Sequence, residues 1–204
     1  MKNVILILGL MLFYLTGCSQ GTGTFKDPRD GKVYKTVKIG NQTWFAENLA
    51  YKPNSGNYCA YDNDTTNVAK YGYLYGWETA KKVCPTGWHL PTDAEWTTLT
   101  DFLGGESISG GKLKETGTTH WGSPNTGATN ESGFTALPGG NRNFFGQFQY
   151  IGDAGRYWSS TDSTKSSNGR IGDAWFRDID ARDGKIGRDI STEVAGFSVR
   201  CIRD

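Results

Sequence analysis

The chain has 204 residues, of which 36% are hydrophobic and 21% charged, and its formal net charge is +1. This length and composition suit one globular domain and exclude a disordered chain or a protein with several membrane spans. The balanced charge, with no run of Lys and Arg, disfavours a nucleic-acid binder, because binding to phosphates requires a basic face. The 28 glycines and the 13% aromatic residues indicate short strands joined by tight turns.

Residues 1–17 have the features of a signal peptide. Lys2 gives a positive start, and the apolar run over residues 4–15 is too short to cross a bilayer comfortably. The tetrapeptide Leu-Thr-Gly-Cys that ends at Cys18 resembles a bacterial lipobox, in which the signal is cleaved before the cysteine and the cysteine is lipidated. An ordinary signal peptide needs a cleavage site of the Ala-x-Ala type, which the sequence lacks.

We therefore predict that Cys18 carries the lipid and is the first residue of the mature chain. Ser19, in place of Asp, resembles the signal that sorts such proteins to the outer membrane of the cell envelope. Residues 18–26 would form the lipidated cysteine and a flexible Gly/Thr-rich tether, and residues 27–204 the folded domain.

The first predicted elements are a strand over residues 33–39 and a hairpin partner over residues 42–45, joined by a Gly-Asn turn. Residues 57–70 are polar and rich in turn formers. The Asp-Asn-Asp sequence at 62–64 offers hard oxygens to calcium, but the glycine and terminal glutamate of a calcium loop are missing, which favours a solvated turn.

Two helices are predicted on either side of a Pro/Gly break. The first starts from Tyr73, places Trp77, Ala80 and Cys84 on one face, and runs to the Cys-Pro break at 84–85.

The second helix starts at Asp93, because Thr92 and Glu95 have the spacing of a capping box. The Gly-Gly pair at 104–105 would end it. Its apolar residues form one core-facing stripe, namely Trp96, Leu99 and Leu103.

The sequence after the second helix indicates loops and short strands. The many Gly, Thr and Asn residues of the range 106–133 predict a long loop, and a loop of that length is usually functional. An Asp-Gly pair at 183–184 predicts a hairpin turn. Strands are expected over residues 134–137, 156–160, 174–180 and 196–202, with Trp88, Trp96, Trp158 and Phe197 in the core.

A family resemblance is carried by sequence blocks spread over residues 27–204. In order, they lie at 34–44, 47–49, 71–75, 84–91, 158–161 and 196–201. Together they resemble the Fibrobacter succinogenes major paralogous domain. That family is similar to the C-type-lectin-like fold and to the formylglycine-generating sulfatase-modifying factors, whose Leu-Pro-Thr-x-Ala-Glu-Trp helix start recurs at 90–96. The resemblance implies an α+β, C-type-lectin-like fold with two helices packed on short antiparallel strands with long loops, and an undefined molecular function.

The resemblance also implies a disulfide between Cys84 and Cys201, and an exported chain would keep it. Cys59 is then left over. Members of the family often carry a second cysteine shortly after it, before Lys-Tyr-Gly, where this chain has Val68.

We expect no cofactor and no metal site. His89 and His120 stand alone in the sequence, and no Cys-x-x-Cys occurs. His120, in a loop and without a partner, is expected to be a surface residue.

We also expect no catalytic residues. The related formylglycine-generating oxidases bind copper and substrate through a pair of cysteines, and no cysteine lies between Cys84 and Cys201. Asp178, Asp180 and Asp183 could supply the carboxylate pair of a glycoside hydrolase, but their spacing is more typical of a solvent-facing strand and turn.

The function we predict is a non-catalytic, surface-tethered lipoprotein module that binds an extracellular carbohydrate or protein ligand through the loops between Glu106 and Arg188. The calcium-ligand strings of true lectins are missing, so carbohydrate binding would be independent of metal. Aromatic faces flanked by hydrogen-bonding charges suit such a site; the predicted residues are Arg142, Phe145, Tyr150, Trp175, Arg177 and Asp180. The alternatives are an enzyme related to the sulfatase-modifying factors and a structural cell-envelope protein.

Overall fold

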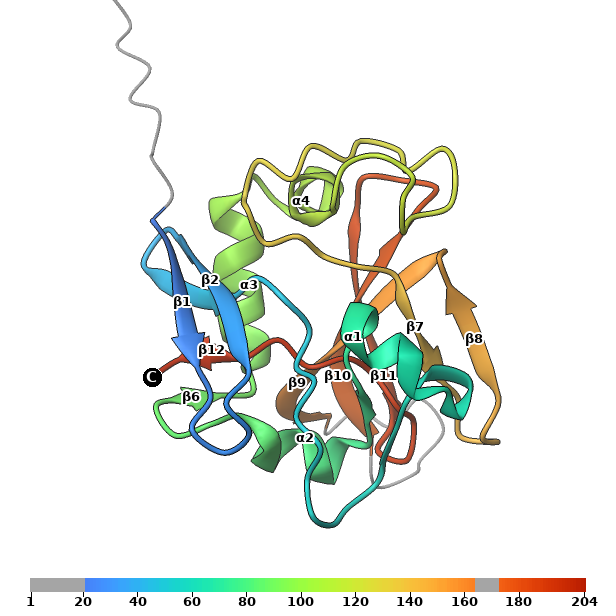
Figure 1. Ribbon diagram of the computed structural model, residues 1–204. Coiled ribbons are helices and arrows are strands. Elements are labelled where there is room, and N and C mark those ends of the chain that lie inside the picture. The colour runs from blue at the N-terminus through green and yellow to red at the C-terminus, as the bar shows by residue number, and fades with distance from the viewer. Residues whose placement is uncertain (1–20, 164–172) are drawn as a thin grey trace, which may run out of the picture.

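The computed structural model describes residues 21–163 and 173–204, which fold into an α+β domain built on two five-stranded sheets (Figure 1). The first sheet has the order β1 (Thr22–Lys26), β2 (Val33–Ile39), β3 (Gln42–Phe45), β12 (Ile202–Arg203), β6 (Trp88–His89). The second has the order β11 (Ile186–Thr192), β10 (Asp173–Asp180), β9 (Ala154–Ser163), β7 (Gly139–Arg142), β8 (Phe148–Ile151). Neighbouring strands are antiparallel, except that β7 and β9 are parallel.

The other elements are short. A two-stranded sheet pairs β4 (Tyr58–Cys59) with β5 (Leu74–Tyr75). The helices are η1 (Tyr61–Asn63), η2 (Thr65–Asn67), α1 (Val68–Tyr71), α2 (Trp77–Val83), α3 (Asp93–Phe102) and α4 (Glu106–Leu113). No helix in the described part of the chain is long and apolar enough to cross a membrane.

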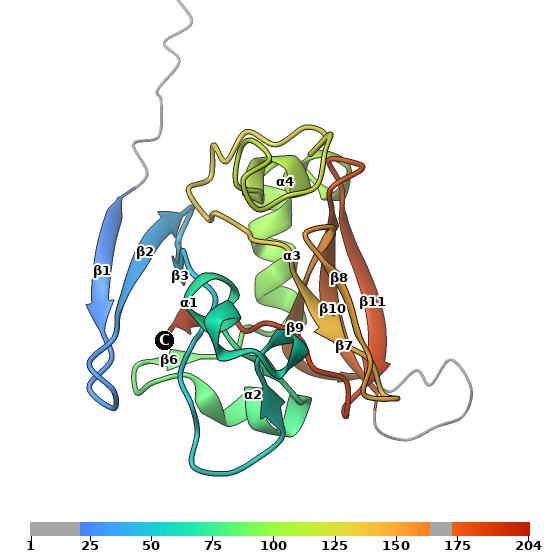
Figure 2. The ribbon, with the colours of Figure 1, turned by 45° about the vertical axis from the view of Figure 1, so that its right-hand side comes forward.

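Helix α3 lies between the two large sheets (Figure 2). The predicted capping box is confirmed: the Glu95 carboxylate accepts from the Thr92 amide at 2.7 Å, and the Thr92 hydroxyl accepts from the Glu95 amide at 3.2 Å. Trp96 is fully buried and packs on Trp44 of β3 and Tyr157 of β9, at ring distances of 4.9 and 6.0 Å. The helix therefore joins the sheets through one aromatic core.

Helix α2 is shorter than the sequence pattern predicts. Leu74 and Tyr75 pair with β4, and the helix begins only at Trp77. The indole of Trp77 donates to the Ser159 carbonyl at 2.7 Å, so the helix is fixed to β9. Tertiary pairing has overridden the helical periodicity of this stretch.

The C-terminal segment connects both sheets. Residues 196–202 do not form the continuous strand that the sequence predicts; they make isolated bridges from Phe197 to Tyr75 and from Ser198 to Tyr157 before β12 begins. The carbonyls of Val199 and Cys201 then accept hydrogen bonds from Leu49 and Phe45. One extended segment thus supplies partners to elements on either side of the core.

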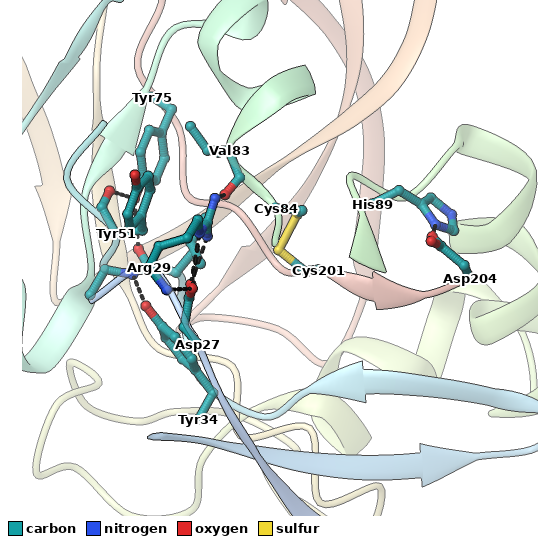
Figure 3. The surroundings of a disulfide bond; sticks show 12 residues. Asp27, Arg29, Tyr34, Tyr51, Tyr75, Val83, Cys84, His89, Cys201 and Asp204 are labelled. Carbon is teal, nitrogen blue, oxygen red and sulfur yellow. Dashed lines mark hydrogen bonds and ion pairs between the residues drawn. A yellow bond between two sulfur atoms is a disulfide. The ribbon is translucent and has the colours of Figure 1, made fainter. Parts of the chain in front are cut away.

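The predicted disulfide is present. Cys84, which ends α2, is bonded to Cys201 and closes 117 residues (Figure 3). Arg29 lies nearby, where it pairs with Asp27 at 2.6 Å and donates to the Val83 carbonyl at 2.9 Å. Cys59 is the free cysteine of the described residues, and it is half-buried.

The structure bears on one of the two predictions for the N-terminal part, the flexible tether. Thr22–Lys26 form β1 in full register with β2, so the tether predicted for residues 18–26 is wrong over its last five residues. This Gly/Thr-rich sequence is held in an extended conformation by its hydrogen bonds to β2. The predicted signal peptide and Cys18 lie outside the described residues.

His89 does not stand alone. One ring nitrogen lies 2.7 Å from the Asp204 carboxylate (Figure 3), and the other lies 2.9 Å from the Glu95 carboxylate. Burial lowers the pKa of His89, but the hydrogen bonds to the two carboxylates outweigh it, and the pKa is raised.

The long loop predicted over residues 106–133 instead begins with helix α4, and residues 134–137 form an isolated bridge between Ala136 and Lys114 rather than a strand. The helix was missed because Gly110 and Gly111 disfavour a helical interior. Both glycines are there for close packing. A Cβ on Gly110 would lie 1.9 Å from the Lys185 carbonyl oxygen, and one on Gly111 would lie 2.2 Å from that of Gly127.

We predict that Gly111→Ala destabilises the protein by ~2 to 3 kcal/mol, because its methyl group would push the Gly127 backbone away. Helix propensity alone predicts the opposite sign, a gain of about 1 kcal/mol. Urea unfolding checks this, with Ser107→Ala, at an exposed position of the same helix, as the matched control. Unchanged or increased stability of Gly111→Ala would contradict the packing of α4.

Candidate functional site

Two adjoining cavities lie where the β1–β2 ribbon meets the segment after α4. Their volumes are about 330 and 380 Å³, and Lys35, Ala46 and Thr135 line both. We call the combined space the Thr135 cleft. One half is charged, with Lys32, Lys35, Glu47, Lys70, Glu115 and His120 in its wall. The other half carries Thr22, Thr24, Val37 and Gly133.

Thr135, at the junction of the two halves, has a strained backbone. Its φ is 54°, a left-handed conformation that is a true outlier for a β-branched residue. Asn130 holds it there, accepting from the Thr135 amide at 2.9 Å and donating to its hydroxyl at 3.0 Å. Strain of this kind persists only where the surroundings impose it, and it is concentrated at functional sites.

Arg200 provides the other restraint on Thr135. Its guanidinium is fully buried and donates to the Thr135 carbonyl at 2.7 Å and the Phe134 carbonyl at 2.6 Å. It also donates to the Asn48 side chain at 2.7 Å and the Phe45 carbonyl at 3.1 Å. Burial lowers the pKa of Arg200 to about 10, so the group stays charged at neutral pH. A buried cation held by neutral oxygens therefore supports the wall of the cleft.

His120 has a partner, contrary to the expectation from sequence. Its Nδ1 lies 2.8 Å from the Glu115 carboxylate, and its ring meets the ring of Tyr71 edge-on at 5.9 Å. Lys114, the residue before Glu115, is fully buried. Its ammonium donates to three carbonyls at 2.8 to 2.9 Å, those of Thr126, Asp180 and Asp183. These contacts fix the backbone that carries Glu115 to the rest of the fold.

The family profile that matches the chain is the Fibrobacter succinogenes major domain, over residues 37–203. The chain belongs to this family. Comparisons with curated proteins and with solved structures give no match. Within this Fibrobacter succinogenes major domain, the cleft spans the start of the matched region: Thr135 and His120 lie inside it, whereas Lys32 and Lys35 precede it.

The structure separates the six residues predicted to bind ligand. Arg142, Phe145 and Tyr150 belong to the β7–β8 hairpin of the domain, with Phe145 at its tip 75% exposed and Tyr150 45% exposed. Arg156 lies over the Tyr150 ring at 4.9 Å. Asp180 is instead paired with Arg182 at the end of β10. None of these residues lines the cleft.

Trp175 and Arg177 lie on the face of β10 that is turned toward α3. Arg177 is buried and pairs with Asp93 at 2.7 Å, so the expectation that it contacts a ligand does not agree with its position. Burial lowers the pKa of this guanidinium despite the pairing. Trp175 is covered by Arg188, 3.5 Å above its ring. These two residues help to dock β10 and β11 on the helix.

A third cavity, of about 370 Å³, lies beside Arg29. The Arg29 guanidinium is already bound to Asp27 and to the Val83 carbonyl, and it lies 3.7 Å from the centre of the Tyr51 ring (Figure 3). Burial would raise the pKa of Asp27, but its hydrogen bonds with Arg29 lower it. The Arg29 side chain in the wall of this cavity is therefore part of a structural ion pair.

Sequence reasoning missed the cleft because its charged residues come from four separate segments, around positions 32–35, 47, 70 and 115–120. No periodicity links them. In residues 21–163 and 173–204, no three His, Cys, Asp or Glu side chains gather in a way that could hold a metal ion. The cleft thus offers charge and hydrogen bonds to a ligand.

We predict that Arg200→Met destabilises the domain by ~3 kcal/mol or more, because it leaves buried acceptors without their donor. Arg203→Met is the control: Arg203 is exposed and only overlies the Trp88 ring, at 4.9 Å, so its loss should cost less than about 1 kcal/mol. The free energy of unfolding in denaturant distinguishes them, and equal losses would count against the structural role of Arg200.

Proposed function

We propose that this domain is a non-catalytic binding module, tethered through a lipid on Cys18 to the outer membrane, and that it holds an extracellular carbohydrate in the Thr135 cleft. The observation that carries the proposal is the strained Thr135 backbone at the junction of two cavities. Binding sites are concave and carry a few convergent polar groups on a rigid frame, which fits this arrangement.

The lining favours a carbohydrate over a protein ligand. Its side chains are mainly charged groups, threonines and small aliphatic residues, and no Phe, Tyr or Trp is among them. Protein interfaces usually bury large apolar anchors in matching pockets, which this cleft does not offer. Sugar hydroxyls need many hydrogen-bond partners, and the cleft has them.

A second candidate function rests on the His120–Glu115 pair, because a carboxylate-bound histidine can act as a general base. The binding role is preferred, since the lining of the cleft contains no Ser or Cys nucleophile and the Thr135 hydroxyl is engaged by Asn130. The oxidase chemistry of sulfatase-modifying factors would need two free cysteines, and Cys59 is the free one in the described part of the chain.

We also propose that the fold is a variant of the C-type-lectin-like fold. Support comes from the two helices, from the disulfide between α2 and the last segment, and from β12, which returns to the sheet that contains β1 and β2.

Only residues 19–21 separate Cys18 from β1. At roughly 3.5 Å per residue, this tether would hold the Thr22 end of the cleft within about 15 Å of the lipid.

The lipid anchor is tested by labelling cells with a fatty-acid analogue. Cys18→Ser should remove the label and leave an unprocessed precursor, because the thiol is the attachment atom. Normal processing and retention of the variant in the membrane would refute this part of the proposal.

Ligand binding is tested by probing a glycan array and a peptide array with a soluble chain that starts at residue 21 and so keeps both sheets and the disulfide. We expect a glycan signal that Ala69→Trp abolishes, because Ala69 is exposed on α1 and lines the cleft. Phe145→Ala, at the hairpin tip, should leave it unchanged. Loss with Phe145→Ala alone, binding only to peptides, or turnover of a bound glycan would each overturn the proposal.

A further inference from the structure

The two carboxylates of the Thr135 cleft are already engaged. Glu47 accepts a hydrogen bond from the Lys35 amide at 2.7 Å, and Glu115 is bound to His120 at 2.8 Å. By contrast, none of Lys32, Lys35 and Lys70 forms an ion pair with any residue of the ranges 21–163 and 173–204, although the Lys32 ammonium lies 5.3 Å from the centre of the Tyr34 ring. Hydrogen bonding does not remove the charge of a carboxylate, but the three lysines outnumber Glu47 and Glu115, so the lining of the cleft has a net positive charge.

A further positive charge lies behind the wall. The buried guanidinium of Arg200 bonds to Thr135 and Asn48, which both line the cleft, and no carboxylate in the described residues forms a salt bridge with it. A charge in a low-dielectric interior acts over a longer distance than one in water. It adds to the attraction of the three lysines for an anion.

The other half of the cleft is suited to neutral hydroxyl groups. Thr22 and Thr24 are paired across the ribbon with Val37 and Lys35, so these four side chains share one face. β1 is an edge strand, and its outer amides and carbonyls are not used by another strand of the sheet. Threonine hydroxyls and backbone groups together provide donors and acceptors without apolar bulk.

From this division we infer that the cleft binds an acidic saccharide, with a uronate carboxylate among Lys32, Lys35 and Lys70 and the adjoining sugar hydroxyls along Thr22 and Thr24. The inference rests on the proposed function and narrows its ligand class. Charged hydrogen bonds to a carboxylate are roughly twice as strong as neutral ones, so the lysine half supplies most of the selectivity. Neutral sugars of the same length lack the group that this half recognises.

The test is calorimetric titration of the purified full chain with tri-galacturonate, with the uncharged galactose trisaccharide and with inorganic sulfate. We expect tri-galacturonate to bind at least tenfold more tightly than either of the others, and its affinity to fall as salt is raised. Lys35→Gln and Lys70→Gln should each weaken it about tenfold. The matched control is Lys38→Gln, which removes the same charge from the opposite face of β2 and should change affinity less than twofold.

Several results would overturn the inference: equal affinity for both trisaccharides, an affinity for sulfate as high as that for tri-galacturonate, or equal losses of affinity in Lys35→Gln and Lys38→Gln. Lys35 and Lys70 are exposed, so the variants should keep the melting temperature of the parent chain. If a neutral saccharide binds and only Ala69→Trp removes it, the acidic ligand is wrong and the proposed function stands. If no saccharide binds at all, both fail.

Discussion

The buried guanidinium of Arg200 is the interaction on which the rest of the structure depends. It collects four oxygen acceptors from β3, from Asn48 and from the 134–135 segment, which are distant in sequence. Burying a charge is costly unless its hydrogen bonds are made, and here they are made without a carboxylate. The neighbouring Cys201 ties the same segment to α2. The C-terminal segment thereby fixes both sheets and the wall of the cleft.

The segment that follows α4 shows how such an interior can replace regular secondary structure. It has almost no strand pairing of its own, yet Lys114 binds three carbonyls beneath it and Arg200 binds two more at its end. Buried cations satisfied by backbone oxygens rigidify a loop because each lost bond would leave an unpaired buried group. A rigid loop can hold a strained residue such as Thr135, and it can present side chains from a fixed wall.

The sequence predicts this fold wherever short-range chemistry decides the outcome. The capping box at Thr92 and the Asp-Gly hairpin turn at 183–184 are local signals, and both elements form as expected. Helix α4 was missed because its glycines serve contacts with backbone at 127 and 185, which no local pattern reveals. The site is harder to predict: Arg177 is buried against Asp93 by tertiary packing that no local pattern indicates, and the cleft joins segments that only the tertiary fold brings together.

The central claim is that the C-terminal segment makes both sheets and the cleft wall one cooperative unit. Native-state hydrogen exchange tests it most directly through the amides of Phe45, Trp158 and Ala136, whose acceptors are Cys201, Ser198 and Leu113, respectively. These amides represent the first sheet, the second sheet and the wall of the cleft. The account predicts that all three exchange with the free energy of global unfolding. Exchange of Ala136 or of one sheet through a separate opening of much lower free energy would contradict it.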